Sequence, residues 1–87
     1  MKIKEGFILR EVSGSFIVVA VGEGTKTFNG MIQLNETGAF LWKLLESGAT
    51  EEQMVEQMMK EYAVEKQVAL CDVKEFIGSL KEANLIV

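Results

Sequence analysis

The sequence contains no histidine and no proline, and it has a single cysteine, Cys71. Without histidine, the chain lacks the commonest general base and the imidazole ligands that many zinc sites use. One cysteine cannot form an internal disulfide or a cluster of thiolate ligands. The longest apolar run, residues 16–21, is far shorter than the roughly 20 residues that span a bilayer. We therefore expect a soluble, cytoplasmic protein with no catalytic residue, no metal site and no cofactor.

Strong positive charge is also missing. The 87 residues include 9 basic and 13 acidic side chains, a net charge of -4, and the whole excess of acid lies in residues 49–87. Because nucleic acids and anionic membranes are bound mainly by clustered Lys and Arg, we expect neither as a partner. A chain of this length forms one small domain, residues 1–87, with too little buried surface to enclose a deep substrate pocket.

The N-terminal part predicts three strands. Residues 7–12 and 16–21 are rich in aromatic and β-branched side chains, and the Ser-Gly-Ser break between them predicts a β-hairpin. A glycine-rich loop over 22–30 leads to a short third strand, 31–34. The second strand is apolar at both alternating sets of positions, and therefore on both of its faces. Either both faces are covered within the domain, or one is available to bind a partner.

Helical periodicity begins at Asn35, whose side chain can cap a helix that runs to about Ser47 and stops at Gly48. Thr50 opens a second helix and has Gln53 three positions later, which is the capping-box arrangement. These signals predict two helices separated by a very short connection.

A third helix is expected over residues 66–83, ending at Asn84, a residue that tolerates the left-handed conformation. Its predicted core-facing positions are Ala69, Val73, Phe76, Ile77 and Leu80. The element order is therefore β-β-β-α-α-α. This order predicts an α+β fold, winged-helix-like, in which a three-stranded antiparallel sheet is followed by three helices.

Several features that resemble functional sites have simpler interpretations. The segment 22–27 lacks the adjacent Gly-Lys and the following helix of a phosphate-binding P-loop. Trp42 on an apolar helix is typical of packing, and Asp72 with Glu75 is typical of a solvated helix face. Helical spacing likewise favours the core for the methionines Met54, Met58 and Met59.

Two features keep a functional interpretation. The third strand, 31–34, is expected at a sheet edge, where unpaired backbone groups must be protected or used. One flank of the third helix carries Leu70 and Ile77 beside Lys74 and Lys81, whereas the other flank carries Val68, Asp72 and Ser79. An apolar strip edged by lysines could receive an extended, somewhat acidic peptide by β-augmentation, although the same strip could simply widen the core.

A longer run of the sequence resembles a known protein family. The run FNGMIQLNETGAFLWKLL at 28–45 resembles the PqqD family, small proteins related to the coenzyme PQQ synthesis protein D. The similarity continues through 48–50, Glu61-Tyr62, Asp72-Val73 and Phe76, so it covers nearly the whole chain. It points to the broad PqqD-like class of recognition elements rather than to PQQ biosynthesis in particular.

The resemblance implies a non-catalytic peptide chaperone of three strands and three helices. Such a protein captures the leader segment of a ribosomally made precursor peptide and presents it to a modifying enzyme, such as a radical SAM protein. The leader adds as a strand to the third strand and lies against the third helix. By position, the strand residues are Met31, Ile32, Gln33 and Leu34. For the helix we select Leu70, Val73, Lys74, Ile77 and Lys81, while the family leaves open which flank is used.

Alternatives remain at this point. A winged-helix unit could be a DNA-binding or regulatory domain, but the third helix carries at least as many acidic as basic residues. An exposed strand edge could instead pair two copies into a homodimer. The chain departs from the family pattern at Ala63-Val64, which replaces the polar residue expected to cap the third helix. We therefore expect this helix to begin later or to fray.

Overall fold

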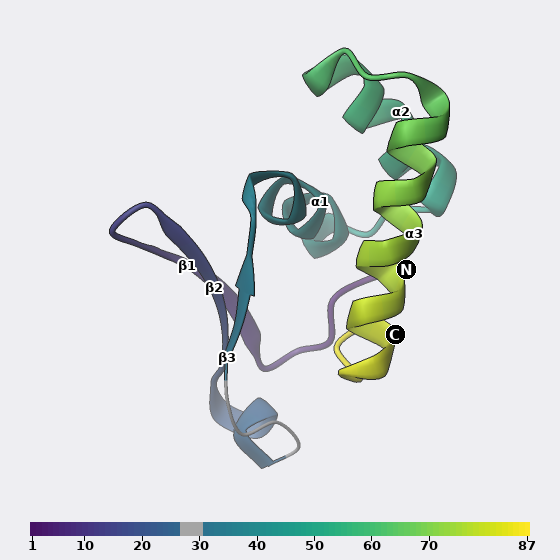
Figure 1. The fold of residues 1–87 in the computed structure, drawn as a ribbon. Coiled ribbons are helices and arrows are strands. Elements are labelled where there is room, and N and C mark those ends of the chain that lie inside the picture. The colour runs from purple at the N-terminus through teal and green to yellow at the C-terminus, as the bar shows by residue number, and fades with distance from the viewer. Residues whose placement is uncertain (27–30) are drawn as a thin grey trace.

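The computed structural model describes residues 1–26 and 31–87, and it shows an antiparallel sheet followed by three helices (Figure 1). The strands lie in the order β1-β2-β3. The predicted α+β, winged-helix-like fold is confirmed, with elements β1 (Phe7–Val12), β2 (Ser15–Ala20), β3 (Met31–Leu34), α1 (Glu36–Ser47), α2 (Glu51–Tyr62) and α3 (Lys66–Glu82).

The segment predicted as a loop over 22–30 contains a short 3-10 helix, η1 (Gly22–Lys26). The hydroxyl of Thr25 donates to the carbonyl oxygen of Gly22 at 2.7 Å within this turn. Residues 27–30, which include the first three positions of the family-like run, lie outside the described residues. The strand that follows them, β3, has the predicted bounds.

A two-residue turn joins β1 to β2. Ser13 and Gly14 both have positive φ, 51° and 80°, and Val12 pairs with Ser15 across the turn. Two consecutive residues of this kind match the type I′ hairpin turn, whose twist suits a right-handed antiparallel pair. The second strand consequently begins one residue earlier than the sequence suggested.

The predicted helix boundaries are observed for α1 and α2. The Asn35 side chain accepts a hydrogen bond from the Gly38 backbone N–H at 2.7 Å and caps α1. Thr50 and Gln53 form the reciprocal capping box of α2, with distances of 3.1 and 2.9 Å. By contrast, Glu65, the N-cap of α3, makes no side-chain cap hydrogen bond. The helix nevertheless begins at Lys66, the residue first predicted, so the expectation of a later start is wrong.

α1 and α3 lie on one face of the sheet, α2 packs against α3, and the elements enclose a buried cluster (Figure 1). Its largest fully buried side chains are Trp42, Leu41, Leu45, Met54, Met58, Leu80, Leu85, Val18 and Val73. The packing role predicted for Trp42 and for the methionine stripe is thus confirmed, with Met59 partly buried against the cluster. Val18 of β2 belongs to the same cluster, so the inner face of the sheet packs against the helices.

The opposite face of the sheet is not covered by any described element. Ile17 and Val19 on this face of β2 are half-buried, and Met31 of β3 is 69% exposed. The sequence left open whether both faces of the second strand are covered or only one. Among the described residues, only the inner face is covered.

The two ends of the described chain meet beside α3 (Figure 1). Ile3 forms an isolated antiparallel bridge with Ile86, and the backbone N–H of Lys4 donates to the carbonyl oxygen of Leu85 at 2.9 Å. Leu85 is fully buried. Sequence periodicity missed this contact, because neither terminal segment is long enough to show a strand pattern.

Candidate functional site

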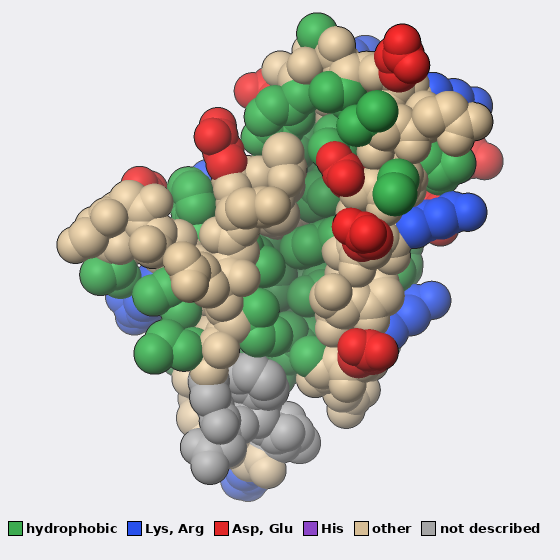
Figure 2. All heavy atoms as spheres, viewed as in Figure 1, with side chains coloured by type: hydrophobic (Ala, Val, Ile, Leu, Met, Phe, Trp, Pro, Cys, Tyr) green, Lys and Arg blue, Asp and Glu red, His purple; other side chains and the backbone are tan. Residues whose placement is uncertain are grey.

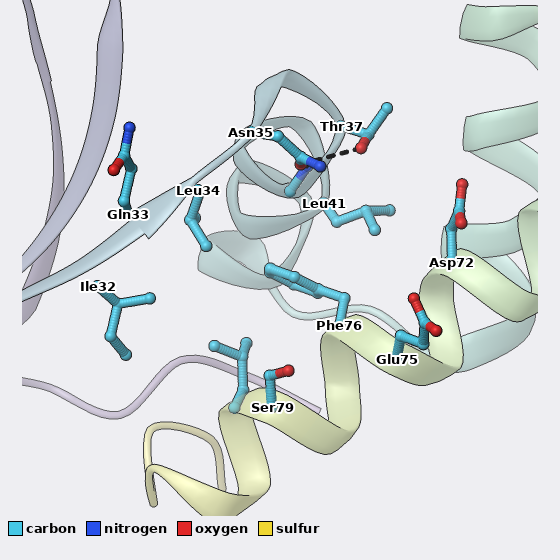
Figure 3. A pocket seen from close by; sticks show the side chains of 12 residues that line it. Ile32, Gln33, Leu34, Asn35, Thr37, Leu41, Asp72, Glu75, Phe76 and Ser79 are labelled. Carbon is cyan, nitrogen blue, oxygen red and sulfur yellow. Dashed lines mark hydrogen bonds between the residues drawn. The ribbon is translucent and has the colours of Figure 1, made fainter.

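β3 is the edge strand of the sheet on the side of α3. It pairs antiparallel with β2 through Phe16↔Leu34 and Val18↔Ile32, and no other described strand pairs with it. Since successive side chains of a strand point to opposite faces, Ile32 and Leu34 share the inner face with Val18. Figure 3 shows these two side chains on the α3 side of the strand, while Gln33 points the other way.

The hydrogen-bond pattern determines which backbone groups this edge leaves free. The N–H of Val21 donates to the carbonyl oxygen of Gly6 at 2.7 Å, so alternate residues of β2, from Ser15 to Val21, direct both backbone groups to β1. The intervening residues of β2 face β3 and pair with Ile32 and Leu34. By this alternation, the N–H and C=O groups of Met31 and Gln33 point away from the sheet. These are the groups that an added strand would bond.

A groove of about 340 Å³ runs between β3, the start of α1 and α3 (Figure 3). Its described lining residues are Ile32, Gln33, Leu34, Asn35, Thr37, Gly38, Leu41, Asp72, Glu75, Phe76, Ser79 and Leu80. The ring of Phe76 projects from α3 toward Leu34 across this groove. The groove therefore lies directly beside the free edge of the sheet.

The groove combines an apolar floor with an acidic rim. Figure 2 shows hydrophobic side chains in the hollow beside β3, acidic groups along the near side of α3 and basic groups projecting from its far side. Asp72 is half-buried and Glu75 is exposed, and both line the groove. No lysine or arginine is among its described lining residues.

The structure separates the predicted site residues into three groups. Ile32, Gln33 and Leu34 line the groove, and Met31 is on the same edge with its side chain on the open face. Val73 and Ile77 are buried in the core, at 0% and 5% exposure.

The remaining predicted residues of α3 lie away from the groove. Leu70 lines a different hollow, between α2 and α3, together with Met59 and several glutamates of α2. Lys74 and Lys81 are exposed and are not among the groove residues. Of the two flanks that the sequence left open, the groove thus uses the one carrying Asp72 and Ser79.

Sequence reasoning did not place Phe76, Asp72 and Glu75 beside the third strand. Phe76 was predicted to face the core, and it packs against the core while also lining the groove. The two acidic residues were predicted on a solvated helix face, and Glu75 is exposed. The sequence does indicate that these residues share one face of the helix, because positions 72, 75, 76 and 79 follow the i, i+3, i+4, i+7 spacing. Three of these four residues are polar, so a search for continuous apolar stripes passes over them.

Among the described residues, the groove is not accompanied by a metal-binding cluster. Within residues 1–26 and 31–87, no group of three or more carboxylate, thiol or imidazole side chains is placed to hold a metal ion. None of the described helices has the length and apolar character needed to cross a bilayer. The free thiol of Cys71 is exposed on α3, outside the lining of the groove.

Tyr62 has a shifted pKa, but it lies away from the groove. Its ring meets Phe40 edge to face, with centroids 5.5 Å apart. Burial, together with the carboxylates of Glu36 and Glu61, raises the pKa of Tyr62 above its usual value of 10.0. A phenol that stays protonated at neutral pH supplies neither a base nor a nucleophile.

Comparisons with known proteins identify a family and a shared fold. The family model described as coenzyme PQQ synthesis protein D (PqqD) matches residues 7–86. Two solved structures have the same fold: TbiB1 in complex with the TbiA(beta) leader peptide, and lasso peptide synthetase B1 complexed with the leader peptide. No curated protein shows a significant sequence match to the chain.

The two structural similarities extend over whole chains. TbiB1 superimposes with a TM-score of 0.76 at 24% identity, covering 98% of this chain and 93% of that one. The lasso peptide synthetase B1 gives 0.74 at 21% identity, covering 97% and 93%. At such low identity the similarity shows the shared fold, whereas the family model carries the relationship.

Proposed function

The chain belongs to the PqqD family, and we propose that it is a non-catalytic chaperone that binds the leader segment of a ribosomally synthesised precursor peptide. The observation that carries this proposal is the free edge of β3, whose outward N–H and C=O groups at Met31 and Gln33 border an open groove against α3. Both structurally similar proteins are named as complexes with leader peptides, which supports the same use of the fold here.

In this proposal the leader becomes a fourth strand of the sheet. Its backbone bonds Met31 and Gln33, so affinity arises largely from main-chain contacts that any extended peptide can make. Specificity arises from the side chains that enter the groove. In this proposal a separate enzyme, such as a radical SAM protein, modifies the captured precursor.

A nucleic-acid function gains no support from the geometry. In a winged-helix DNA-binding domain, α3 would be the helix placed against the phosphate backbone. Here its groove-facing flank presents Asp72 and Glu75, which would repel phosphate.

Titration of isotope-labelled protein tests the proposal. The probe is a set of synthetic leader peptides taken from precursor genes that neighbour this one. We expect amide chemical-shift changes in β3 and at Asp72, Glu75, Phe76 and Ser79. Changes confined to α2, or no changes with any leader, would reject the groove as the binding site.

A further inference from the structure

The proposed β-augmentation fixes which side chains of a bound peptide can enter the groove. A strand added to β3 continues its pleat, so every second peptide side chain lies on the face of Ile32 and Leu34. Neighbouring side chains on that face are separated by about 7 Å along the strand, because each residue rises about 3.3 Å. The groove therefore contacts positions j and j+2 of the peptide, and position j+1 points to the open face.

One part of the groove suits an apolar side chain. Leu34 and the Phe76 ring face each other across it, and Ile32, Leu41 and Leu80 complete an apolar surface (Figure 3). Burying an apolar side chain on this surface is favourable in proportion to the area removed from water. A polar group placed here would lose its hydration without a described partner for it.

The other part of the groove carries negative charge. Asp72 lies one helical turn before Phe76, toward the end of the groove formed by Thr37, and Glu75 lies between them (Figure 3). An apolar peptide side chain over the half-buried Asp72 would strip water from a carboxylate and leave it unpaired. A lysine or arginine would instead pair with it, and an acidic residue would be repelled.

We propose that the groove selects extended peptides in which an apolar residue, seated on Phe76, is two positions from a lysine or arginine that pairs with Asp72 and Glu75. This selectivity rests on the proposed leader-binding function and specifies its ligand. It also reverses the sequence-based expectation of an acidic peptide, because Lys74 and Lys81, on which that expectation depended, are outside the groove.

The test is a selection from a displayed library of random peptides of roughly nine residues, long enough to pair with the 4 residues of β3. The library is screened against the native protein and against the double variant Asp72→Asn/Glu75→Gln. A second double variant, Glu52→Gln/Glu56→Gln, changes net charge equally at exposed positions of α2 and serves as the matched control.

We expect the native protein and the α2 control to enrich peptides with an apolar residue two positions from Lys or Arg. The groove variant should lose that bias. Replacing the basic residue of an enriched peptide by Gln should weaken binding to the native protein about fivefold, less at high salt, since exposed charge pairs are screened. The same replacement should leave binding to the groove variant unchanged.

Two other outcomes would overturn the inference. One rejects the charge selectivity alone, and the other also rejects the proposed leader-binding function. Enriched peptides that perturb β3 but are neutral or acidic would contradict the charge selectivity while preserving the groove as the binding site. A selection that enriches no peptide, with a protein shown to be folded by its amide spectrum, would contradict both.

Discussion

The variant Gln33→Pro is expected to lower the affinity for a leader peptide at least about tenfold, equivalent to roughly 1.4 kcal/mol. Proline removes the outward N–H of Gln33, and its ring occupies the space in which a peptide carbonyl would approach. The bonds from β3 to β2 are made by Ile32 and Leu34, so they remain. Proline is tolerated on an edge strand for this reason.

The matched control is Gln33→Ala, which removes the same side chain and keeps the backbone N–H. We expect the alanine variant to bind within about twofold of the native protein, because the amide side chain points away from α3 (Figure 3). Fluorescence anisotropy with a labelled leader measures both affinities, and thermal unfolding checks that both variants fold. Equal binding by the proline variant would contradict strand addition, and loss of its folding would contradict the assigned hydrogen-bond pattern.

The variant Trp42→Ala should be the most destabilising single truncation in α1, with a loss of about 3–5 kcal/mol in the free energy of unfolding. Trp42 is fully buried in the core cluster, which also contains Leu41, a residue that lines the groove. For a small domain, whose total stability is of order 5–10 kcal/mol, this loss removes a large part of the folded population. Urea unfolding followed by circular dichroism measures it.

The variant Trp42→Phe is the informative comparison, because the indole Nε1 has no hydrogen-bond partner among the described residues. Phenylalanine leaves a cavity but also removes a buried, unsatisfied donor whose desolvation costs about 1–3 kcal/mol. The two effects oppose each other, so we expect a net loss of less than about 1.5 kcal/mol. A loss as large as that of the alanine variant would show that the Nε1–H is satisfied in solution.

Local signals in the sequence were sufficient for most of the architecture. Asn35, the Thr50 and Gln53 pair, and Asn84 each act through the backbone within a few residues, so their roles follow from short patterns. The buried methionines of α2 follow from helical spacing in the same way. The edge position of β3 was also foreseeable, because consecutive strands of a meander lie side by side and the third strand then has a neighbour on one side only.

The lining of the groove was not foreseeable from the same signals. It depends on the rotation of α3 about its axis, which is set by the packing of Val73 and Ile77 into the core. A flank with Leu70, Lys74 and Lys81 and a flank with Asp72, Phe76 and Ser79 lie on either side of these two core residues. Tertiary packing decides which flank faces β3. In this structure it is the flank with Asp72, Phe76 and Ser79.

Residue-resolved hydrogen exchange tests the central claim most directly. The amides of Ile32 and Leu34 are bonded to β2, so they should exchange slowly with or without a peptide. The amides of Met31 and Gln33 should exchange fast in the free protein and become protected when a leader peptide is bound. Protection of these two amides alone within β3 is the predicted result. Unchanged exchange at Met31 and Gln33 in the presence of saturating peptide would contradict the account.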